Sequence, residues 1–399
     1  MSGDELKYVS EALDSNWVAP VGPNIENFER KVQQYLLSVS RNNPGKPINE
    51  VVALASGTSA IHLALIGCGV GKGDTVIVQS FTFCASANPI TYLGAQPVFV
   101  DSEPDTWNID PELLEQAIKG TIRDTGKKPK AIVVADIYGM PAKMDELTYI
   151  ASKYGIPIIE DAAEALGSRY KDAACGTLTE YGVLSFNGNK IITTSGGGTL
   201  ICHSAATKRE MVHYATQAKE NLPYYQHEHI GYNYRMSNIS AGIGLGQMSV
   251  LREHIAHHKH VALLYESAFA DIIGISFHKA TDTLYDSNYW LSTIIIDPNL
   301  KIAGQEYAYD KDTSLYTDCR PNPNVEMLRR YLESMGIETR PLWKPLHIQP
   351  IFSKASHYTN GISEQLFRTG LCLPSGPLVR DEDVMYIMDC IRSCLKGQY

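Results

Sequence analysis

Lys190 is the residue of this sequence best suited to covalent chemistry. It follows Ser185-Phe186-Asn187-Gly188-Asn189 and precedes the run Gly196-Gly197-Gly198. A lysine amine that is desolvated, or that lies near another cation, is a good nucleophile and forms a Schiff base with a carbonyl group. Most lysines are instead solvated surface groups. The small residues around Lys190 favour chemistry, because glycines let a flat ring approach the amine closely.

A second candidate is the stretch Ser56-Gly57-Thr58-Ser59-Ala60, which lies between an apolar run and a helical pattern. At the start of a helix, free backbone amides and the helix dipole attract an anion. Hydroxyl groups and the small Gly57 would complete a cradle for a phosphate group. The same residues would also make an ordinary helix N-cap, so this stretch alone leaves both interpretations open.

A third candidate is the acidic pair Glu160-Asp161, which ends an apolar run, with Glu164 a few residues further on. A carboxylate at the buried end of a strand is poorly solvated unless a cationic group meets it. The cation could belong to a bound cofactor, because ligands of α/β sheets bind at the carboxyl ends of the strands. An internal arginine in a structural salt bridge is the alternative.

Together the three stretches supply the parts of a pyridoxal phosphate site: a phosphate anchor, a carboxylate for the pyridine nitrogen and an amine for the aldehyde. A protonated pyridine nitrogen makes the ring an electron sink, and Asp161 would keep it protonated. Lys190 could then act as a general base and acid. The co-occurrence predicts a pyridoxal phosphate enzyme more strongly than any one stretch does.

Five stretches resemble the sugar aminotransferases of the DegT/StrS family, which have the type I aminotransferase fold. They are SGTSAIHLAL (56–65), SFTFCASANPI (80–90), EDAAEALGS (160–168), SFNGNK (185–190) and GYNYRMSNI (231–239). They occur in the family's order and span most of the large domain. The resemblance implies an α/β fold, with a mixed, mostly parallel sheet, helices on both faces and a smaller C-terminal α+β domain.

The resemblance also implies roles for single residues. Lys190 would bind the cofactor covalently and move the proton between substrate and cofactor, while Asp161 would pair with the pyridine nitrogen. Phe83 matches the aromatic residue that stacks on the cofactor ring. Glu164 matches a position near the ring oxygen where glutamine or histidine is common. The phosphate ligands would be Thr58, Ser59 and Ser185, beside Gly57 of the expected cradle.

Two more matches imply a homodimer with shared active sites. Asn233 matches an asparagine that reaches the phosphate of the neighbouring subunit's cofactor, and Arg235 matches a residue that approaches the neighbouring substrate. His227 and His229 lie just before this stretch. The sequence leaves open whether these histidines contact substrate or only the subunit interface.

The resemblance extends to one branch of the family, which aminates a 4-keto-6-deoxy derivative of UDP-N-acetylglucosamine on the way to bacillosamine-type sugars. The matching features are the opening SNWVAPVGP, Glu164, Ser195-Gly196 where many relatives have Gly-Glu, and the stretch 340–347. Lys344 and His347 in that stretch would suit a nucleotide diphosphate or a carboxylate donor, or are exposed charges of a Pro-rich connector. We therefore expect amino transfer from L-glutamate to C4 of a UDP-linked 4-keto-6-deoxy-N-acetylhexosamine. A dTDP- or GDP-linked keto-sugar is the alternative.

The elements that must position these residues alternate between strands and helices. Short apolar runs predict strands at 51–55, 75–78, 98–100, 131–135, 156–159, 183–186 and 199–201. Several runs are apolar throughout, which is typical of a parallel sheet covered on both faces. Helical spacing predicts helices at 6–13 and 25–36, the second capped by Asn24, and a long helix at 237–264.

The helical pattern changes beyond about Ala270 to isolated strands such as 289–296, and a terminal helix follows at 384–391. A chain of 399 residues is also long enough for two domains. We expect a large cofactor-binding domain over residues 1–255 and a small C-terminal domain over residues 256–399.

Composition and charge narrow the function classes. The formal net charge of −9 without a basic cluster argues against nucleic-acid binding. The most apolar window, 51–70, contains polar residues, and residues 1–9 do not resemble a signal peptide, so we expect a cytoplasmic protein without a membrane segment. The eight cysteines form no CxxC pair, which favours a reducing compartment. His254, His257 and His258 share a helix face, but no further ligand completes the set, so no metal is expected.

Two other function classes stay open. A catalytically silent regulator or scaffold could share the fold, although it would not need Lys190, Asp161 and Ser185 together. A nicotinamide-dependent oxidoreductase on the same sugars is disfavoured, because no GxGxxG stretch follows a strand. The glycines of 69–73 come after a helix and before a strand, which is the wrong order for a phosphate-binding loop.

Overall fold

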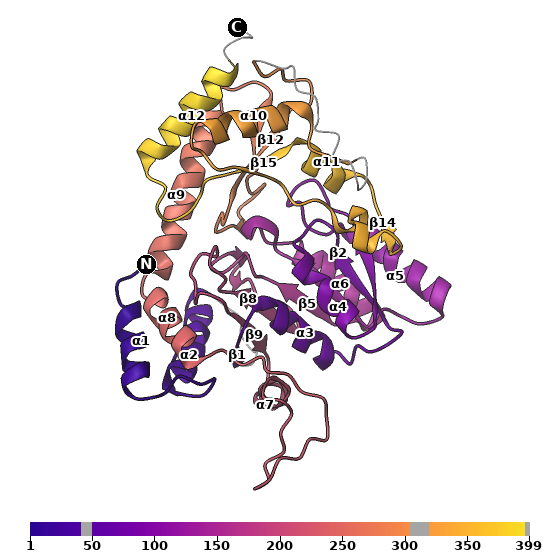
Figure 1. Ribbon diagram of the computed structural model, residues 1–399. Helices are drawn as coiled ribbons and strands as arrows, with labels where there is room; N and C mark the ends of the chain where they lie inside the picture. Colours follow the sequence, from indigo (N-terminus) through magenta and orange to yellow (C-terminus); the bar gives the residue numbers. More distant parts are fainter. Residues whose placement is uncertain (41–49, 304–318, 396–399) are drawn as a thin grey trace.

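An eight-stranded sheet forms the centre of the computed structural model, which describes residues 1–40, 50–303 and 319–395 (Figure 1). The strand order is β1-β9-β8-β5-β4-β2-β3-β14. The strands are β1 (Glu50–Leu54), β2 (Thr75–Gln79), β3 (Gln96–Val100), β4 (Ala131–Ala135), β5 (Ile158–Asp161), β8 (Tyr181–Ser185), β9 (Gly198–Cys202) and β14 (Ser356–Tyr358). Only the two pairs that involve β9 are antiparallel. The predicted strands and the mostly parallel sheet are thus confirmed.

Helices cover both faces of this sheet. On one face lie α2 (Pro23–Val39), α5 (Pro111–Thr125), α6 (Met144–Tyr154) and α8 (Asn238–Met248), and on the other lie α3 (Gly57–Gly67), α4 (Asn88–Tyr92) and α7 (Ala205–Ala215). The helix α1 (Glu5–Asp14) packs on α8. In β1, Val51 and Ala53 belong to the core on the α2 side, whereas Val52 and Leu54 belong to the core on the α3 side. Since side chains of a strand alternate between faces, burial of both faces explains the continuous apolar runs.

Two predicted helices differ from those in the structure, one by a break and one by its first residue. The helix predicted at 237–264 is broken into α8 and α9 (Leu251–Phe269). The predicted N-cap residue Asn24 is wrong, because α2 already begins at Pro23. Proline suits the first helical position, where its missing N–H would have no partner in the helix. The backbone N–H of Asn24 instead donates to Asn238 Oδ1 at 2.9 Å, which ties α2 to α8.

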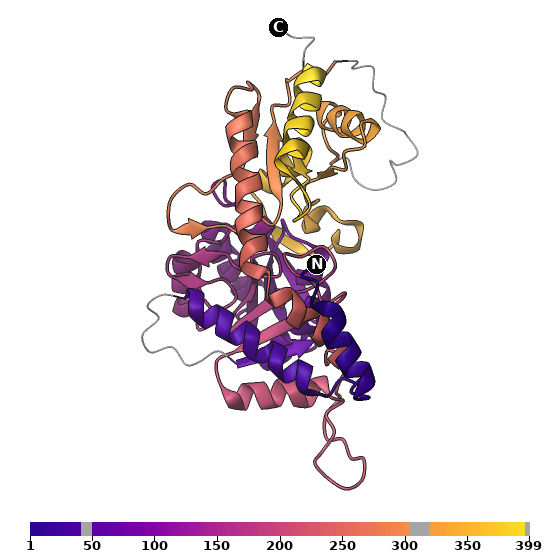
Figure 2. The ribbon, with the colours of Figure 1, turned by 90° about the vertical axis from the view of Figure 1, so that its left-hand side faces the viewer.

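A smaller antiparallel sheet with the order β10-β12-β15-β13 lies beyond the large one (Figure 2). Its strands are β10 (Ile275–Phe277), β12 (Ser292–Ile296), β13 (Arg340–Pro341) and β15 (Gly370–Leu373), and α9, α10 (Pro323–Ser334) and α12 (Asp381–Leu395) pack around its core. This part is the expected smaller α+β unit. The remaining elements are α11 (Ile362–Thr369), the sheet β11 (Tyr285–Asp286), β6 (Arg169–Tyr170) and β7 (Ala173–Ala174), and 3₁₀ turns at Cys84–Ser86, Ile137–Gly139, Leu346–Ile348 and Pro350–Phe352.

The helix α9 takes part in two separate cores. Its residues Leu251 and Ile255 pack into the core beside the large sheet, whereas Val261 and Tyr265 pack into the core of the small sheet. We propose that the domain boundary lies within this helix at 255/256. The large domain then covers residues 1–255 and the small domain residues 256–399.

Other features weighed in the sequence have local structural roles. Gly69 and Gly73, both with positive φ, lie in the turn between α3 and β2. His254 Nδ1 lies 3.0 Å from the carbonyl oxygen of Ile191, and His258 is buried. All eight cysteines are free. Within the described ranges, no helix has the length and apolar character needed to cross a membrane.

Candidate active site

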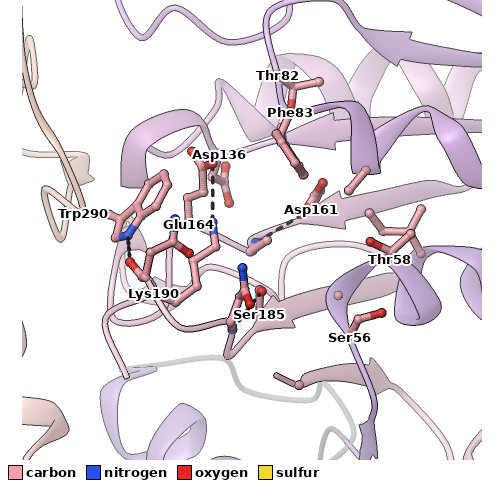
Figure 3. Close-up of a pocket in the computed structure, with 18 of the residues that line it drawn as sticks. Ser56, Thr58, Thr82, Phe83, Asp136, Asp161, Glu164, Ser185, Lys190 and Trp290 are labelled. Atoms are coloured by element: carbon pink, nitrogen blue, oxygen red, sulfur yellow. Dashed lines mark hydrogen bonds and ion pairs between the residues drawn. The ribbon is translucent and has the colours of Figure 1, made fainter. Parts of the chain in front are cut away.

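A cavity of about 310 Å³ lies at the carboxyl ends of the parallel strands (Figure 3). The loops that follow β1, β2, β4, β5 and β8 form its walls, which is where α/β sheets bind their ligands. The predicted site residues that line it are Gly57, Thr58, Phe83, Asp161, Glu164, Ser185 and Lys190. The three stretches that suggested a cofactor site are therefore brought to one place.

The start of α3 forms one wall of the cavity. Ser56 Oγ accepts a hydrogen bond from the backbone N–H of Ser59 at 3.0 Å, and Ser59 Oγ accepts one from the N–H of Ser56 at 3.1 Å. This reciprocal capping box fixes the first helical turn. Ser56, Gly57 and Thr58 line the cavity, while the Ser59 hydroxyl faces the backbone of the cap. The cap and the anion cradle are thus parts of the same turn.

Asp161 ends β5 and is 7% exposed. Its Oδ2 accepts a hydrogen bond from Ser86 Oγ at 2.6 Å, and its Oδ1 accepts one from the N–H of Ala163 at 3.2 Å. Burial raises the pKa of Asp161, and the two hydrogen bonds and the charge of Lys190 offset this only in part. The positive charge that acts on Asp161 belongs to this lysine rather than to an arginine. A buried carboxylate of this kind is well suited to pair with a protonated ring nitrogen.

Lys190 is enclosed by an acid and an aromatic ring. Its Nζ lies 3.5 Å from Glu164 Oε1 and 3.8 Å from the centroid of the Trp290 ring. The Lys190 side chain is 13% exposed. Trp290 Nε1 donates to the carbonyl oxygen of Asn189 at 2.8 Å, so the same tryptophan also holds the backbone next to the lysine. Figure 3 shows Lys190, Glu164 and Trp290 together on one side of the cavity.

Glu164 is fixed by the backbone after β4. Its Oε2 accepts a hydrogen bond from the N–H of Tyr138 at 2.7 Å. Burial raises the pKa of Glu164, while the charge of Lys190 and the Tyr138 amide oppose the shift. The carboxyl group therefore takes up a proton more readily than an exposed glutamate, and the protonated form could donate a hydrogen bond.

A larger cavity of about 1180 Å³ adjoins the first and shares Phe83, Trp290 and Trp343 with it. The ring of Phe83 is half exposed and lies 5.4 Å from the ring of Trp343. Lys344 lines this larger cavity, and burial lowers the pKa of Lys344. A substrate in the larger cavity would therefore reach both the aromatic pair and a lysine.

Three predicted site residues lie elsewhere in the single chain. Asn233 is exposed and belongs to the segment after α7. Arg235 Nη1 donates to Glu29 Oε1 at 2.7 Å. His347 is buried, with its Nδ1 2.7 Å from Ser80 Oγ. None of the three is among the described residues that line either cavity.

Several residues in or beside the cavity were not identified from the sequence. Ser86 does not line the cavity itself but donates to Asp161 from beside it. It lies within the stretch 80–90, so its hydroxyl could have been noticed there. Asp136 also lines the cavity, and burial together with the nearby Glu160 raises its pKa. Trp290 follows its partner Asn189 by 101 residues, and no local pattern marks it.

The residues of the cavity fit pyridoxal phosphate. A phosphate group would meet a helix N-terminus without a side chain at Gly57, where an added Cβ would lie 3.4 Å from Ser185 Cβ. A ring nitrogen would have the buried Asp161, and an aldehyde would have the amine of Lys190. Anchor, ring partner and amine are the three contacts that this cofactor requires.

The family comparison agrees with this geometry. The DegT/DnrJ/EryC1/StrS aminotransferase family matches residues 1–392. The chain belongs to this family. It is a pyridoxal phosphate-dependent nucleotide-sugar aminotransferase.

Individual relatives match this family member over almost their whole length. EpsN of Bacillus subtilis (strain 168) is 42% identical over 387 residues, or 96% of this chain and 91% of EpsN. The GDP-perosamine synthase of Escherichia coli O157:H7 is 33% identical over 98% of this chain and 95% of its own. The crystal structure of a DegT DnrJ EryC1 StrS aminotransferase from Brucella abortus matches with a TM-score of 0.83 and 28% identity, over 98% of this chain and 95% of that one.

Proposed function

We propose that this aminotransferase moves the amino group of L-glutamate to C4 of a UDP-linked 4-keto-6-deoxy-N-acetylhexosamine, toward bacillosamine-type sugars. The observation that carries the chemistry is the meeting of Lys190, Asp161 and Glu164 in one buried cavity. The choice of sugar rests on the resemblance of the stretch 340–347, whose Lys344 lines the adjoining larger cavity. The 33% identity to a GDP-perosamine synthase favours a GDP-linked keto-sugar as the second candidate.

We propose a separate role for each of three residues that line the cavity. Bound pyridoxal phosphate supplies an electron sink that lets the carbon next to the substrate nitrogen lose its proton. In our proposal Lys190 would hold the cofactor and would move that proton with its Nζ. Asp161 would keep the ring nitrogen protonated, and Phe83 would stack on the ring.

The phosphate group would be held at the start of α3. Thr58 and Gly57 line the cavity there, with Ser185 opposite. In our proposal these residues bind the phosphate, and Ser59 contributes through the cap that orients the first helical turn. Glu164 would lie beside the ring oxygen, and burial raises the pKa of this carboxyl group.

We further propose a homodimer in which Asn233 and Arg235 reach the partner's active site. The exposure of Asn233 supports this proposal. Arg235 would have to share its guanidinium with Glu29. For His347, the buried contact with Ser80 supports a positioning role, in which it fixes the segment that carries Lys344.

An absorption experiment tests the function. We expect the purified protein with pyridoxal phosphate to be yellow, to lose the visible band on addition of L-glutamate, and to regain it with UDP-4-keto-6-deoxy-N-acetylglucosamine. Recovery with a GDP-linked keto-sugar alone would overturn the UDP assignment and leave the enzyme class intact.

Lys190→Ala should fold but give no turnover, and steady-state transamination by this variant would contradict the role of Lys190. Asp161→Asn should retain cofactor yet turn over more slowly, because a neutral pyridine is a weaker electron sink.

A further inference from the structure

The last turn of α7 and the segment after it carry a cluster of metal-ligating side chains outside both cavities. His213, Glu220 and His229 each offer one ligand atom, and these atoms all lie within 4.8 Å of one another. We propose that the three residues bind a divalent cation of the zinc type. The proposal is independent of the catalytic chemistry, since none of them lines the cofactor cavity.

The ligand set suits such a cation. Two imidazoles and one carboxylate form a common zinc site, which leaves a fourth position for water. His213 Nε2 already lies 3.7 Å from Glu220 Oε1. The neighbouring cation, Lys219, lies over the ring of Tyr225 at 4.3 Å, so it does not occupy the place of a metal. His213 is in the last turn of α7, where the negative end of the helix dipole also favours a positive charge.

The backbone brings the three ligands together from three segments. After α7, Gln217 and Ala218 both adopt positive φ, at 64° and 49°. This conformation is strained in residues other than glycine. It turns the chain back so that the N–H of Ala218 donates to the carbonyl oxygen of His213 at 2.8 Å. Glu220 follows this turn, where the chain leads away from α7; we call this part the outgoing limb, and the part from His229 to Asn233, which leads back, the return limb.

The return limb lies against the same turn. At Gly231 an added Cβ would lie 2.1 Å from the carbonyl carbon of Gln217, so only glycine allows this approach. The N–H of Tyr232 then donates to the carbonyl oxygen of Tyr214 at 2.7 Å. His229 is therefore carried to His213 by a close backbone contact. Figure 1 shows the segment between these limbs extending away from α7.

A bound cation would join the last turn of α7 to both limbs of the segment. The return limb continues into Asn233 and Arg235, which the proposed dimer places at the partner's active site. The metal would thus hold the path of residues 216–233. This consequence rests on the proposed function, whereas the cation site itself does not.

The test uses the cofactor-loaded enzyme after removal of metals with EDTA. We expect isothermal titration with ZnCl₂ to give one site per chain, and Co²⁺ to give a visible absorption band at the same stoichiometry. Glu220→Gln and His229→Ala should each weaken binding by about tenfold or more, because each removes a ligand. His260→Ala is the matched control, since His260 pairs with Asp381 at 2.9 Å in the small domain, and its affinity should equal that of the wild type.

Hydrogen exchange provides a second measurement. Zn²⁺ should protect amides of residues 216–233 in the wild type and not in Glu220→Gln. Absence of stoichiometric Zn²⁺ binding, or equal affinity in the wild type and both ligand variants, would overturn the site. These outcomes are separate from the proposed function, because that function is judged by the colour change with glutamate and keto-sugar in the absence of zinc.

Discussion

Replacement of Arg235 by methionine separates a role within its own chain from a role at a substrate. The guanidinium Nη1 donates to Glu29 Oε1 at 2.7 Å and to the carbonyl oxygen of Ala53 at 3.1 Å. The side chains of Arg235 and Glu29 are 12% and 8% exposed. Glu29 Oε1 also accepts from the N–H of Ala53 at 2.8 Å, and Lys208 Nζ lies 3.0 Å from Glu29 Oε2. The acid therefore has two further partners.

These contacts determine how much free energy of unfolding the Arg235→Met variant should lose. Removal of one partner from a buried ion pair lowers the free energy of unfolding by about 3–5 kcal/mol. Because Glu29 keeps Lys208 and the Ala53 amide as partners, we expect a smaller loss, about 2–3 kcal/mol, for Arg235→Met. The Lys208 side chain is 28% exposed, so Lys208→Met should lower the free energy of unfolding by about 1 kcal/mol or less.

Urea unfolding followed by circular dichroism measures the effect. The double variant Glu29→Gln/Arg235→Met should lose less than the sum of the single variants, since the two side chains interact. Arg123→Met is the control, because the Arg123–Asp124 pair is exposed and its loss should leave stability unchanged. If Arg235→Met unfolds at the wild-type urea concentration but loses turnover, the reasoning from Glu29 is refuted and the arginine acts on the substrate.

Three further changes test other contacts. Ser56→Ala removes the cap of α3 and should lower the free energy of unfolding by about 1 kcal/mol, with weaker retention of pyridoxal phosphate in dialysis. Burial acts to raise the pKa of Glu5, but hydrogen bonds from the Ser2 amide and from Gln247, among others, hold it at about 2 instead of 4.5. Stability from Glu5 is therefore present above pH 4.5 and is lost as pH falls toward 2, and Glu5→Gln should flatten this part of the melting temperature profile. Burial lowers the pKa of His258 from 6.5 to about 4, so the unfolded chain binds its proton first and stability falls from pH 6.5 toward 4. His258→Gln should reduce that slope, and an unchanged profile would contradict the burial argument.

The sequence predicted the large sheet because its signal is local. Each strand is a short apolar run, and its burial on both faces follows from the absence of polar alternation. The candidate site residues at strand ends were predicted in the same way, and the structure places them there: Asp161 ends β5, Ser185 ends β8, and Gly57 follows β1 after two residues of loop. A residue type with distinctive chemistry at such a place is visible without knowledge of the tertiary structure.

Contacts between residues far apart in the chain could not be predicted, because no local sequence pattern marks them. His347 meets Ser80, 267 residues away, and this pairing buries a histidine that the sequence suggested as a substrate ligand. Trp290 meets Asn189 across 101 residues. Both contacts depend on how the C-terminal part packs on the large sheet, and hydrophobic periodicity describes only which face of an element is buried. The break between α8 and α9 was missed for a related reason, since both helices continue the same apolar spacing.

The segment just before β12 also completes the candidate cofactor cavity. Asn288 Nδ2 donates to the carbonyl oxygens of Glu164 and Leu166, each at 2.9 Å, and Asn288 Oδ1 accepts from the N–H of Trp290 at 2.8 Å. One short segment therefore supports the backbone of Glu164 and places the Trp290 ring over Lys190. Trp290 also lines the larger cavity. In the proposed function, a substrate bound there would contact the same ring that encloses the Lys190 amine, which would link substrate binding to the surroundings of Lys190.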